Sequence, residues 1–259
     1  MTAHIHPSAV IDDDAELGAD VVVGPGAVLG PKVIVGSNTE IQAHAILERN
    51  THVGRDCLVG YGTVLGSAPQ DRHDPGDGTM VSVGDGTQLR EYVTVHRATA
   101  SGRVTRVGAR CLLMAYVHVA HDCVIEDDVV LANAVQLAGH VCVGHHAWIG
   151  GQTPVHQFVR IGEYAFVGGG SRVPQDVPPF ACVAGIPLRL YGANVVGLRR
   201  AGFSPDVRLA LKRAFRLLFN SDRTTTAAVE ELRLREDGIV EVQRLLDFVA
   251  SSERGVLVG

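Results

Sequence analysis

The chain has 259 residues, of which 46% are hydrophobic and 20% charged, as in ordinary globular proteins, and its net charge of −5 argues against general nucleic-acid binding. No stretch approaches the ~18 apolar residues of a membrane span, and the first ten residues lack a signal peptide's basic start and apolar run, so we expect a cytoplasmic protein. The five cysteines are scattered without a CxxC pair, which indicates reduced thiols and neither a disulfide framework nor a zinc cage.

An internal repeat of six residues dominates the chain. An aliphatic residue occupies every sixth position from Ile5 to Leu65 and again from Val107 to Val173. Neither a helix nor an alternating strand has this period, whereas a flat face of six residues followed by a corner does. Three faces close a triangular coil of eighteen residues, so the repeat predicts a little over nine stacked coils with the aliphatic residues inside and small residues at the corners.

This pattern resembles the hexapeptide-repeat acyltransferase superfamily. The resemblance implies a mainly β fold, a left-handed parallel β-helix, over residues 1–184. The left hand comes from the superfamily, because the general rule for crossovers between parallel strands predicts the opposite.

Two stretches interrupt the repeat. Residues 67–80, SAPQDRHDPGDGTM, are rich in Asp, Gly and Pro and predict a loop that replaces the regular faces of one coil. A long loop on a rigid scaffold is a candidate binding element, although a tolerated surface insertion is the simpler interpretation. A smaller lapse near residue 101 predicts a bulging corner.

The repeat ends in a proline cluster, and residues 185–259 predict a C-terminal α-helical domain. Ser204 and Pro205 have the residue types of an N-cap and a first helical position. Two further helical patterns follow, TTAAVEELRLRE and IVEVQRLLDFVASS. Residues 1–184 carry 11 basic and 19 acidic residues whereas the tail carries 12 and 9, so the tail has a mild preference for anionic partners.

Histidines gather in the central coils. His121 and His140 are nineteen residues apart, about one coil, which predicts that they lie on adjacent coils near the same edge. His118 precedes this pair and His156 follows it, again about one coil after His140. Solvated side chains are the simplest interpretation of any one histidine, but a column over several coils favours a functional site.

Two kinds of chemistry suit such a column. His140 and His145 are five residues apart, as in the γ-class carbonic anhydrases of the same fold, but the upstream position where that family has a ligand is Val104, so we expect no metal. An imidazole can instead act as a general base at neutral pH. Asp122 could orient or stabilise the His121 ring if the corner geometry allows contact, and a backbone amide such as that of Gly139 could stabilise an oxyanion.

Several motifs together resemble the UDP-N-acetylglucosamine O-acyltransferase family of lipid A biosynthesis, over nearly the whole chain. They are REYVTVHRAT (90–99), AHDC (120–123), LAGH (137–140), the run IGG-x-T-x-VHQF (149–158), VGGGS (167–171), QDVPP (175–179) and GLRRAGFS (197–204), with PQD at 69–71. Each is weak alone and the set is specific.

The resemblance implies transfer of a (3R)-3-hydroxyacyl group from the phosphopantetheine of acyl carrier protein to the 3-hydroxyl of UDP-N-acetylglucosamine. It further implies a homotrimer with active sites between subunits, and no bound cofactor. His121 matches the catalytic base, Asp122 its partner and Gly139 the oxyanion amide. Other matched positions contact substrate: Gln70, Asp71, His118, His140, His156, Gln157, Asn194 and Arg200.

Three positions bear on specificity within the family. Val196 stands where the family often has a Glu that contacts the ribose, and His73 stands where a Lys is common, so details of nucleotide binding differ here. Gly169 matches the position that limits acyl-chain length, and its small size favours a long chain.

Three alternatives remain. The N-acyltransferase that acts on UDP-3-O-acylglucosamine shares the helix and a histidine base, although it usually carries an extra N-terminal uridine-binding domain. Another hexapeptide-repeat sugar acyltransferase would share the same motifs in part. A non-catalytic β-helix scaffold belongs to a different class, and it would keep its function without His121.

Overall fold

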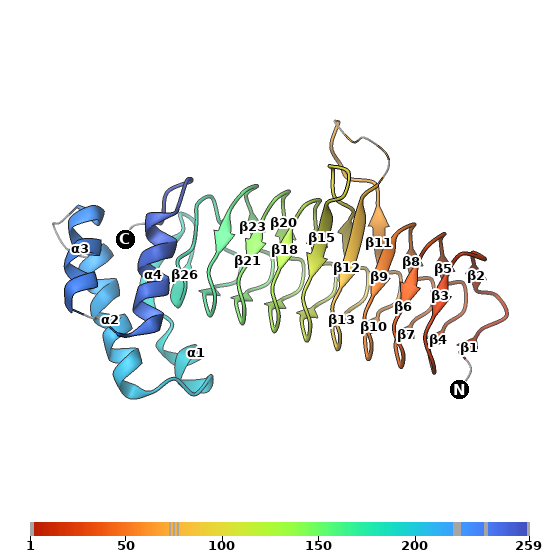
Figure 1. Cartoon of the computed structure of the whole chain (residues 1–259), viewed down its shortest axis with the longest axis horizontal. Coiled ribbons are helices and arrows are strands. Elements are labelled where there is room, and N and C mark those ends of the chain that lie inside the picture. The colour runs from red at the N-terminus through yellow and green to blue at the C-terminus, as the bar shows by residue number, and fades with distance from the viewer. Residues whose placement is uncertain are drawn as a thin grey trace.

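The computed structural model describes residues 3–72, 74, 76, 78–219, 224–235 and 238–257. It is an elongated β-helix with four helices at its C-terminal end (Figure 1). His73 lies outside the described residues.

Short parallel strands form three sheets, one for each face of the prism. The first sheet contains β1 (His4–Ile5), β4 (Val22–Val23), β7 (Glu40–Ile41), β10 (Leu58–Val59), β13 (Gln88–Leu89), β16 (Leu112–Leu113), β19 (Val130–Leu131), β22 (Trp148–Ile149), β25 (Phe166–Val167), β26 (Ala181–Ala184) and β27 (Arg189–Ala193). The second contains β2 (Val10–Ile11), β5 (Val28–Leu29), β8 (Ile46–Leu47), β11 (Val64–Ser67), β14 (Thr94–His96), β17 (His118–Val119), β20 (Gln136–Leu137) and β23 (Pro154–Val155). The third contains β3 (Glu16–Leu17), β6 (Ile34–Val35), β9 (Thr51–Val53), β12 (Met80–Val83), β15 (Val104–Val107), β18 (Val124–Ile125), β21 (Cys142–Val143) and β24 (Arg160–Ile161).

The register confirms the eighteen-residue coil. Ile11 pairs with Leu29, and Leu29 pairs with Leu47, each eighteen positions apart. The second residue of the regular strands points inward, and Leu29 and Leu47 are at most 1% exposed. Ile5 is the exception at 49% exposure, because only one neighbouring coil covers the first strand.

The corners differ from the expectation of small residues. Most have a residue with φ near +60°, and among the residues that the structure describes eighteen other than glycine adopt positive φ, including Asp122 and His140. Asp, Asn and His tolerate this left-handed conformation better than other side chains. The corners therefore present functional side chains at a fixed angle to the prism.

Two predictions about the coils were wrong. The loop at 67–80 does not replace the faces of a coil, and the β-helix has fewer than the predicted nine coils. Leu65 pairs with Val95, thirty positions later, and Val95 pairs with Val119, twenty-four positions later. The segment from β11 to β12 thus contains twelve inserted residues at one corner, and the segment 97–103 contains six inserted residues in the next coil. These inserted residues take up one coil of the count, and the first insertion protrudes from the prism between β11 and β12 (Figure 1).

The tail contains α1 (Val195–Arg200), α2 (Pro205–Phe219), α3 (Thr225–Arg235) and α4 (Val240–Ala250). The predicted start of α2 is confirmed, because Ser204 Oγ accepts from the Val207 N–H at 3.3 Å. The boundary at residue 184 stays a prediction, since β27 extends the first sheet beyond it by pairing antiparallel with β26. In the described part of the chain, no helix combines the length and hydrophobicity that crossing a bilayer requires.

Candidate active site

The histidine column lies at the corner between the second and third sheets. His121 follows β17 and precedes β18, and His140 follows β20 and precedes β21, one coil further along. Their rings meet edge to face with centroids 5.1 Å apart. The prediction that these two histidines lie close together on adjacent coils is therefore confirmed.

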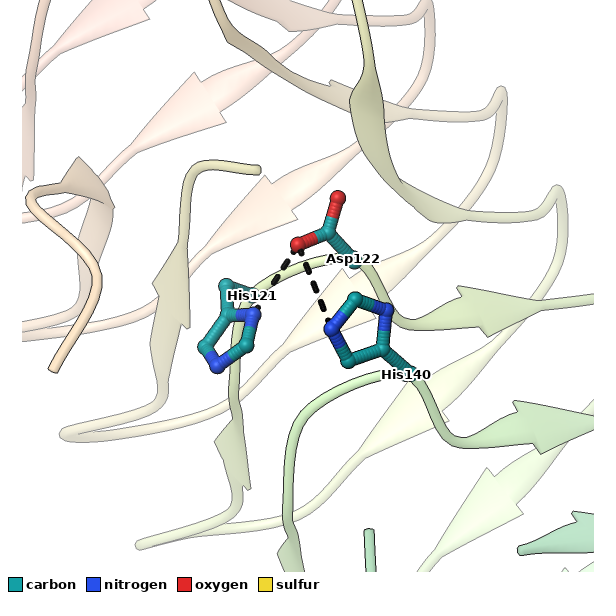
Figure 2. Close-up of side chains that lie close together, drawn as sticks. All are labelled: His121, Asp122 and His140. Atoms are coloured by element: carbon teal, nitrogen blue, oxygen red, sulfur yellow. Dashed lines mark hydrogen bonds and ion pairs between the residues drawn. The ribbon is translucent and has the colours of Figure 1, made fainter. Parts of the chain in front are cut away.

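Asp122 contacts both histidines of this corner and also Thr99. Its Oδ2 atom lies 2.9 Å from His121 Nδ1 and 3.9 Å from His140 Nε2, and Figure 2 shows both rings turned toward this oxygen. The same oxygen accepts from the Thr99 N–H at 3.1 Å and the Thr99 hydroxyl at 2.6 Å. The left-handed φ of 58° at Asp122 is what allows adjacent side chains to meet.

The charge of Asp122 is stabilised inside the protein. Its side chain is 2% exposed, and burial alone would raise its pKa, but hydrogen bonds from Thr99 and His121 hold the pKa below its ordinary value. An ionised carboxylate at this distance is an acceptor for an Nδ1–H of His121. A neutral ring in that tautomer has its lone pair on Nε2.

Loop residue Asp71 approaches the other nitrogen of the same ring. Its Oδ2 lies 3.8 Å from His121 Nε2, and its side chain is 31% exposed. Gln70, its neighbour, is exposed. A substrate hydroxyl placed at Nε2 would therefore also lie within reach of Asp71.

Gly139 lies against the His121 ring. A Cβ at this position would come within 2.6 Å of both Cε1 and Nε2 of His121, so a larger residue here would require the His121 ring to move. The Gly139 N–H has no acceptor among the residues that the structure describes. Pro31 takes the equivalent position at the same corner, which shows that the β-helix needs no backbone donor there.

The histidines on either side of the pair differ from one another. The Nδ1 atom of His118 forms a hydrogen bond of 2.7 Å with the Thr94 hydroxyl. Burial lowers the pKa of His118, and the nearby His121 ring lowers it further. His156 is exposed, and its Nδ1 lies 3.2 Å from Arg254 Nη2. Gln157 is exposed beside it.

Sequence reasoning missed several residues of this corner. Phe158, and not His156, lies one full coil after His140 and stacks on its ring at 4.5 Å between centroids. His96 is one of the central histidines that the sequence indicates; its ring centroid lies 4.9 Å from that of His118, and burial lowers the pKa of His96 to about 4. Thr99 ends the motif REYVTVHRAT and begins the second break of the repeat, but neither signal indicates that it contacts Asp122.

Three predicted residues lie elsewhere in this chain. Asn194 caps α1, and with Arg200 it lines a pocket of about 760 Å³ against Trp148 and Phe166 on the first sheet. Gly169 lies at the corner between the first and second sheets. Because the first sheet is the face opposite the histidine corner, one chain does not bring these residues to His121.

The carbonic-anhydrase-like pair is not assembled. His145 lies at a different corner from His140, close to Asp128 and His146. Arg110 donates to both oxygens of Asp128 at 2.8 and 2.7 Å, which leaves that carboxylate poorly suited to a cation. His121, Asp122 and His140 also lie close enough to share an ion, and Asp122 Oδ2 already contacts His121 Nδ1 at 2.9 Å.

The lowered pKa of Asp122 predicts a pH-dependent difference in stability. A carboxyl with a depressed folded pKa contributes stability above its unfolded pKa of about 3.9, and this contribution is lost as pH falls through the folded pKa. The free energy of unfolding of the native chain relative to Asp122→Asn should therefore decrease from pH 6 to pH 3. Urea unfolding of both proteins at several pH values measures this, and a constant difference would contradict it.

Comparisons with known proteins identify the family. The family model described as Udp N-acetylglucosamine O-acyltransferase, domain 2, matches residues 176–257. The acyl-[acyl-carrier-protein]–UDP-N-acetylglucosamine O-acyltransferase of Syntrophobacter fumaroxidans is 45% identical over 98% of this chain and 99% of its own length. That of Synechocystis is 52% identical over 66% of this chain and 62% of its own length.

Solved structures agree over the whole fold. The LpxA structure from Acinetobacter baumannii has a TM-score of 0.95 at 34% identity, and LpxA from Moraxella catarrhalis has 0.92 at 38%. Each comparison covers 98% of this chain and 99% of the other. The chain is a left-handed parallel β-helix and belongs to the UDP-N-acetylglucosamine O-acyltransferase family.

Proposed function

We propose that this chain transfers a (3R)-3-hydroxyacyl group from acyl carrier protein to the 3-hydroxyl of UDP-N-acetylglucosamine, the first step of lipid A biosynthesis. The names of its relatives support the substrates. The observation that carries the chemistry is the contact of 2.9 Å between Asp122 and Nδ1 of His121. It orients one ring nitrogen and leaves the other free.

The reaction follows from this geometry. His121 Nε2 accepts the proton of the sugar hydroxyl as its oxygen attacks the thioester carbonyl, and Asp122 stabilises the imidazolium that forms. The N–H of Gly139 donates to the oxyanion of the tetrahedral intermediate. The C–S bond then breaks, and the proton on His121 passes to the departing thiol of phosphopantetheine. No covalent enzyme intermediate and no bound cofactor or metal takes part.

The remaining site residues bind substrate in this proposal. Asp71 and Gln70 contact the sugar and the acyl chain from the loop. His118, His140, His156 and Gln157 line the cleft along the corner.

The nucleotide contacts come from a second copy of the chain. Asn194 and Arg200 would meet the nucleotide and its diphosphate, because guanidinium groups bind phosphate oxygens well. They lie at α1 in a pocket beside the first sheet, away from His121, so we propose a homotrimer in which one subunit's first sheet faces the next subunit's histidine corner. Val196 is 53% exposed in the same pocket and offers no hydrogen bond to the ribose. We also propose a cytoplasmic location for the chain.

An assay of the purified protein with UDP-N-acetylglucosamine and hydroxyacyl carrier proteins tests the function. The product mass should correspond to one added hydroxyacyl group, held as an ester at the 3-hydroxyl. His121→Ala should lower kcat by about 10²–10⁴-fold, because that is the usual contribution of a general base, while the protein stays folded. His44→Ala, at an exposed corner, is the control. A His121→Ala protein with normal turnover would refute the assigned base, and an amide product would favour the N-acyltransferase.

Gly139→Ala should abolish most turnover because its Cβ would displace the His121 ring. A displacement of about 1 Å can cost roughly 10²-fold in rate. The loss should disappear in a His121→Ala background, where the ring is absent. Steady-state kinetics of the two single variants and the double variant measure this. A double variant whose fold-loss in kcat equals the product of the two single fold-losses would contradict it.

Gly169→Met should shorten the preferred acyl chain. Added side-chain volume at this corner would fill the end of the acyl site if Gly169 limits chain length in this protein as the family resemblance implies. Competition between hydroxyacyl carrier proteins of graded length measures the preference. An equal response of all chain lengths would contradict the assignment.

A further inference from the structure

The segment 97–103, with its six inserted residues, contacts both the projecting loop and the catalytic corner. It follows β14 directly, and the Arg97 N–H donates to the Ser67 carbonyl at 3.1 Å, where the loop begins. The insertion therefore lies between the loop that carries Asp71 and the corner that carries His121.

Arg97 holds the loop through a buried charge. Its side chain is 9% exposed, and Nη1 and Nη2 donate to the two carboxylate oxygens of Asp74 at 2.8 and 2.6 Å. Nη1 also donates to the Thr79 hydroxyl at 2.9 Å, at the far end of the loop. Such a forked pair is directional as well as strong, and removing one partner leaves the other buried and uncompensated.

The same short segment holds the catalytic carboxylate. Thr99, two residues after Arg97, donates both its N–H and its hydroxyl to Asp122 Oδ2. Thr105, just beyond the insertion, accepts from the Asp122 N–H at 2.8 Å. The segment 97–103 therefore contacts Asp122 directly through Thr99, and it contacts the loop that carries Asp71 through Arg97.

We propose that Arg97 is a positioning residue that holds the loop so that Asp71 faces Nε2 of His121. It does not touch the reacting atoms and acts through Asp74 and the loop backbone. This inference rests on the proposed function for its kinetic consequence, but its structural part can be tested independently. Arg55 provides a comparison, because its guanidinium also forms an ion pair with a carboxylate, that of Asp85. This pair is exposed, with side chains 67% and 51% exposed.

Arg97→Met and Asp74→Asn test the proposal, with Arg55→Met as the matched control. Hydrogen exchange at the described loop amides should become faster in both variants and stay unchanged in the control. The value of kcat/KM for UDP-N-acetylglucosamine should fall by about 10- to 100-fold, as expected for a misplaced binding group. Arg97→Lys should retain more of the native kcat/KM than Arg97→Met but less than the native chain, because an ammonium cannot donate two parallel hydrogen bonds to a carboxylate as a guanidinium does.

Non-additivity separates positioning from general loss of structure. If Arg97 acts through Asp71, then Asp71→Asn should lower kcat/KM in the native chain and have little further effect in Arg97→Met. Losses that multiply, or loop exchange that does not change, would overturn the proposal. If Arg97→Met fails to fold, Asp74→Asn carries the same test, since that side chain is 20% exposed. A native protein without transferase activity would refute the proposed function, while the exchange result would still decide whether Arg97 holds the loop.

Discussion

The eighteen-residue register of parallel strands is the constraint on which the rest of the structure depends. Each coil repeats the corner of the coil before it, so residues at equivalent positions lie about 4.8 Å apart. Asp122, His140 and Phe158 occupy equivalent corner positions for this reason, so the rings of His140 and Phe158 stack, while the ring of His121, one position before Asp122, meets His140 edge to face. A left-handed residue at the corner also turns Asp122 back onto its neighbour, which an ordinary strand would prevent.

The chemistry is concentrated where the regular scaffold is interrupted. A uniform prism offers flat faces and equal corners, and it has no element that reaches over a substrate. The two insertions supply what the prism lacks, because one brings Asp71 to His121 Nε2 and the other brings Thr99 to Asp122. The catalytic corner is therefore enclosed by segments that the repeat does not specify, while its own histidines depend on the repeat for their spacing.

The sequence predicted those features that depend on the period. The inward aliphatic residues, the three faces and the proximity of His121 to His140 all follow from counting positions. The coil count was wrong because inserted residues interrupt the count, and the positions of Arg97 and Thr99 depend on an irregular path that no period encodes. Phe158 was missed because a spacing of sixteen residues between histidines was taken as one coil, whereas the true stacking partner is eighteen residues away. Asn194 and Arg200 lie on another face of the same chain, and the pattern of the sequence does not indicate this separation from His121.

The central claim is that Asp122 fixes the tautomer of His121 and so makes Nε2 the base. Nitrogen NMR of protein labelled at histidine, with His121→Ala used to assign the signal, tests this directly at a pH where the ring is neutral. The account predicts that Nδ1 carries the proton and Nε2 does not, and that Asp122→Asn weakens this preference. A neutral ring protonated at Nε2 in the native protein would contradict the account.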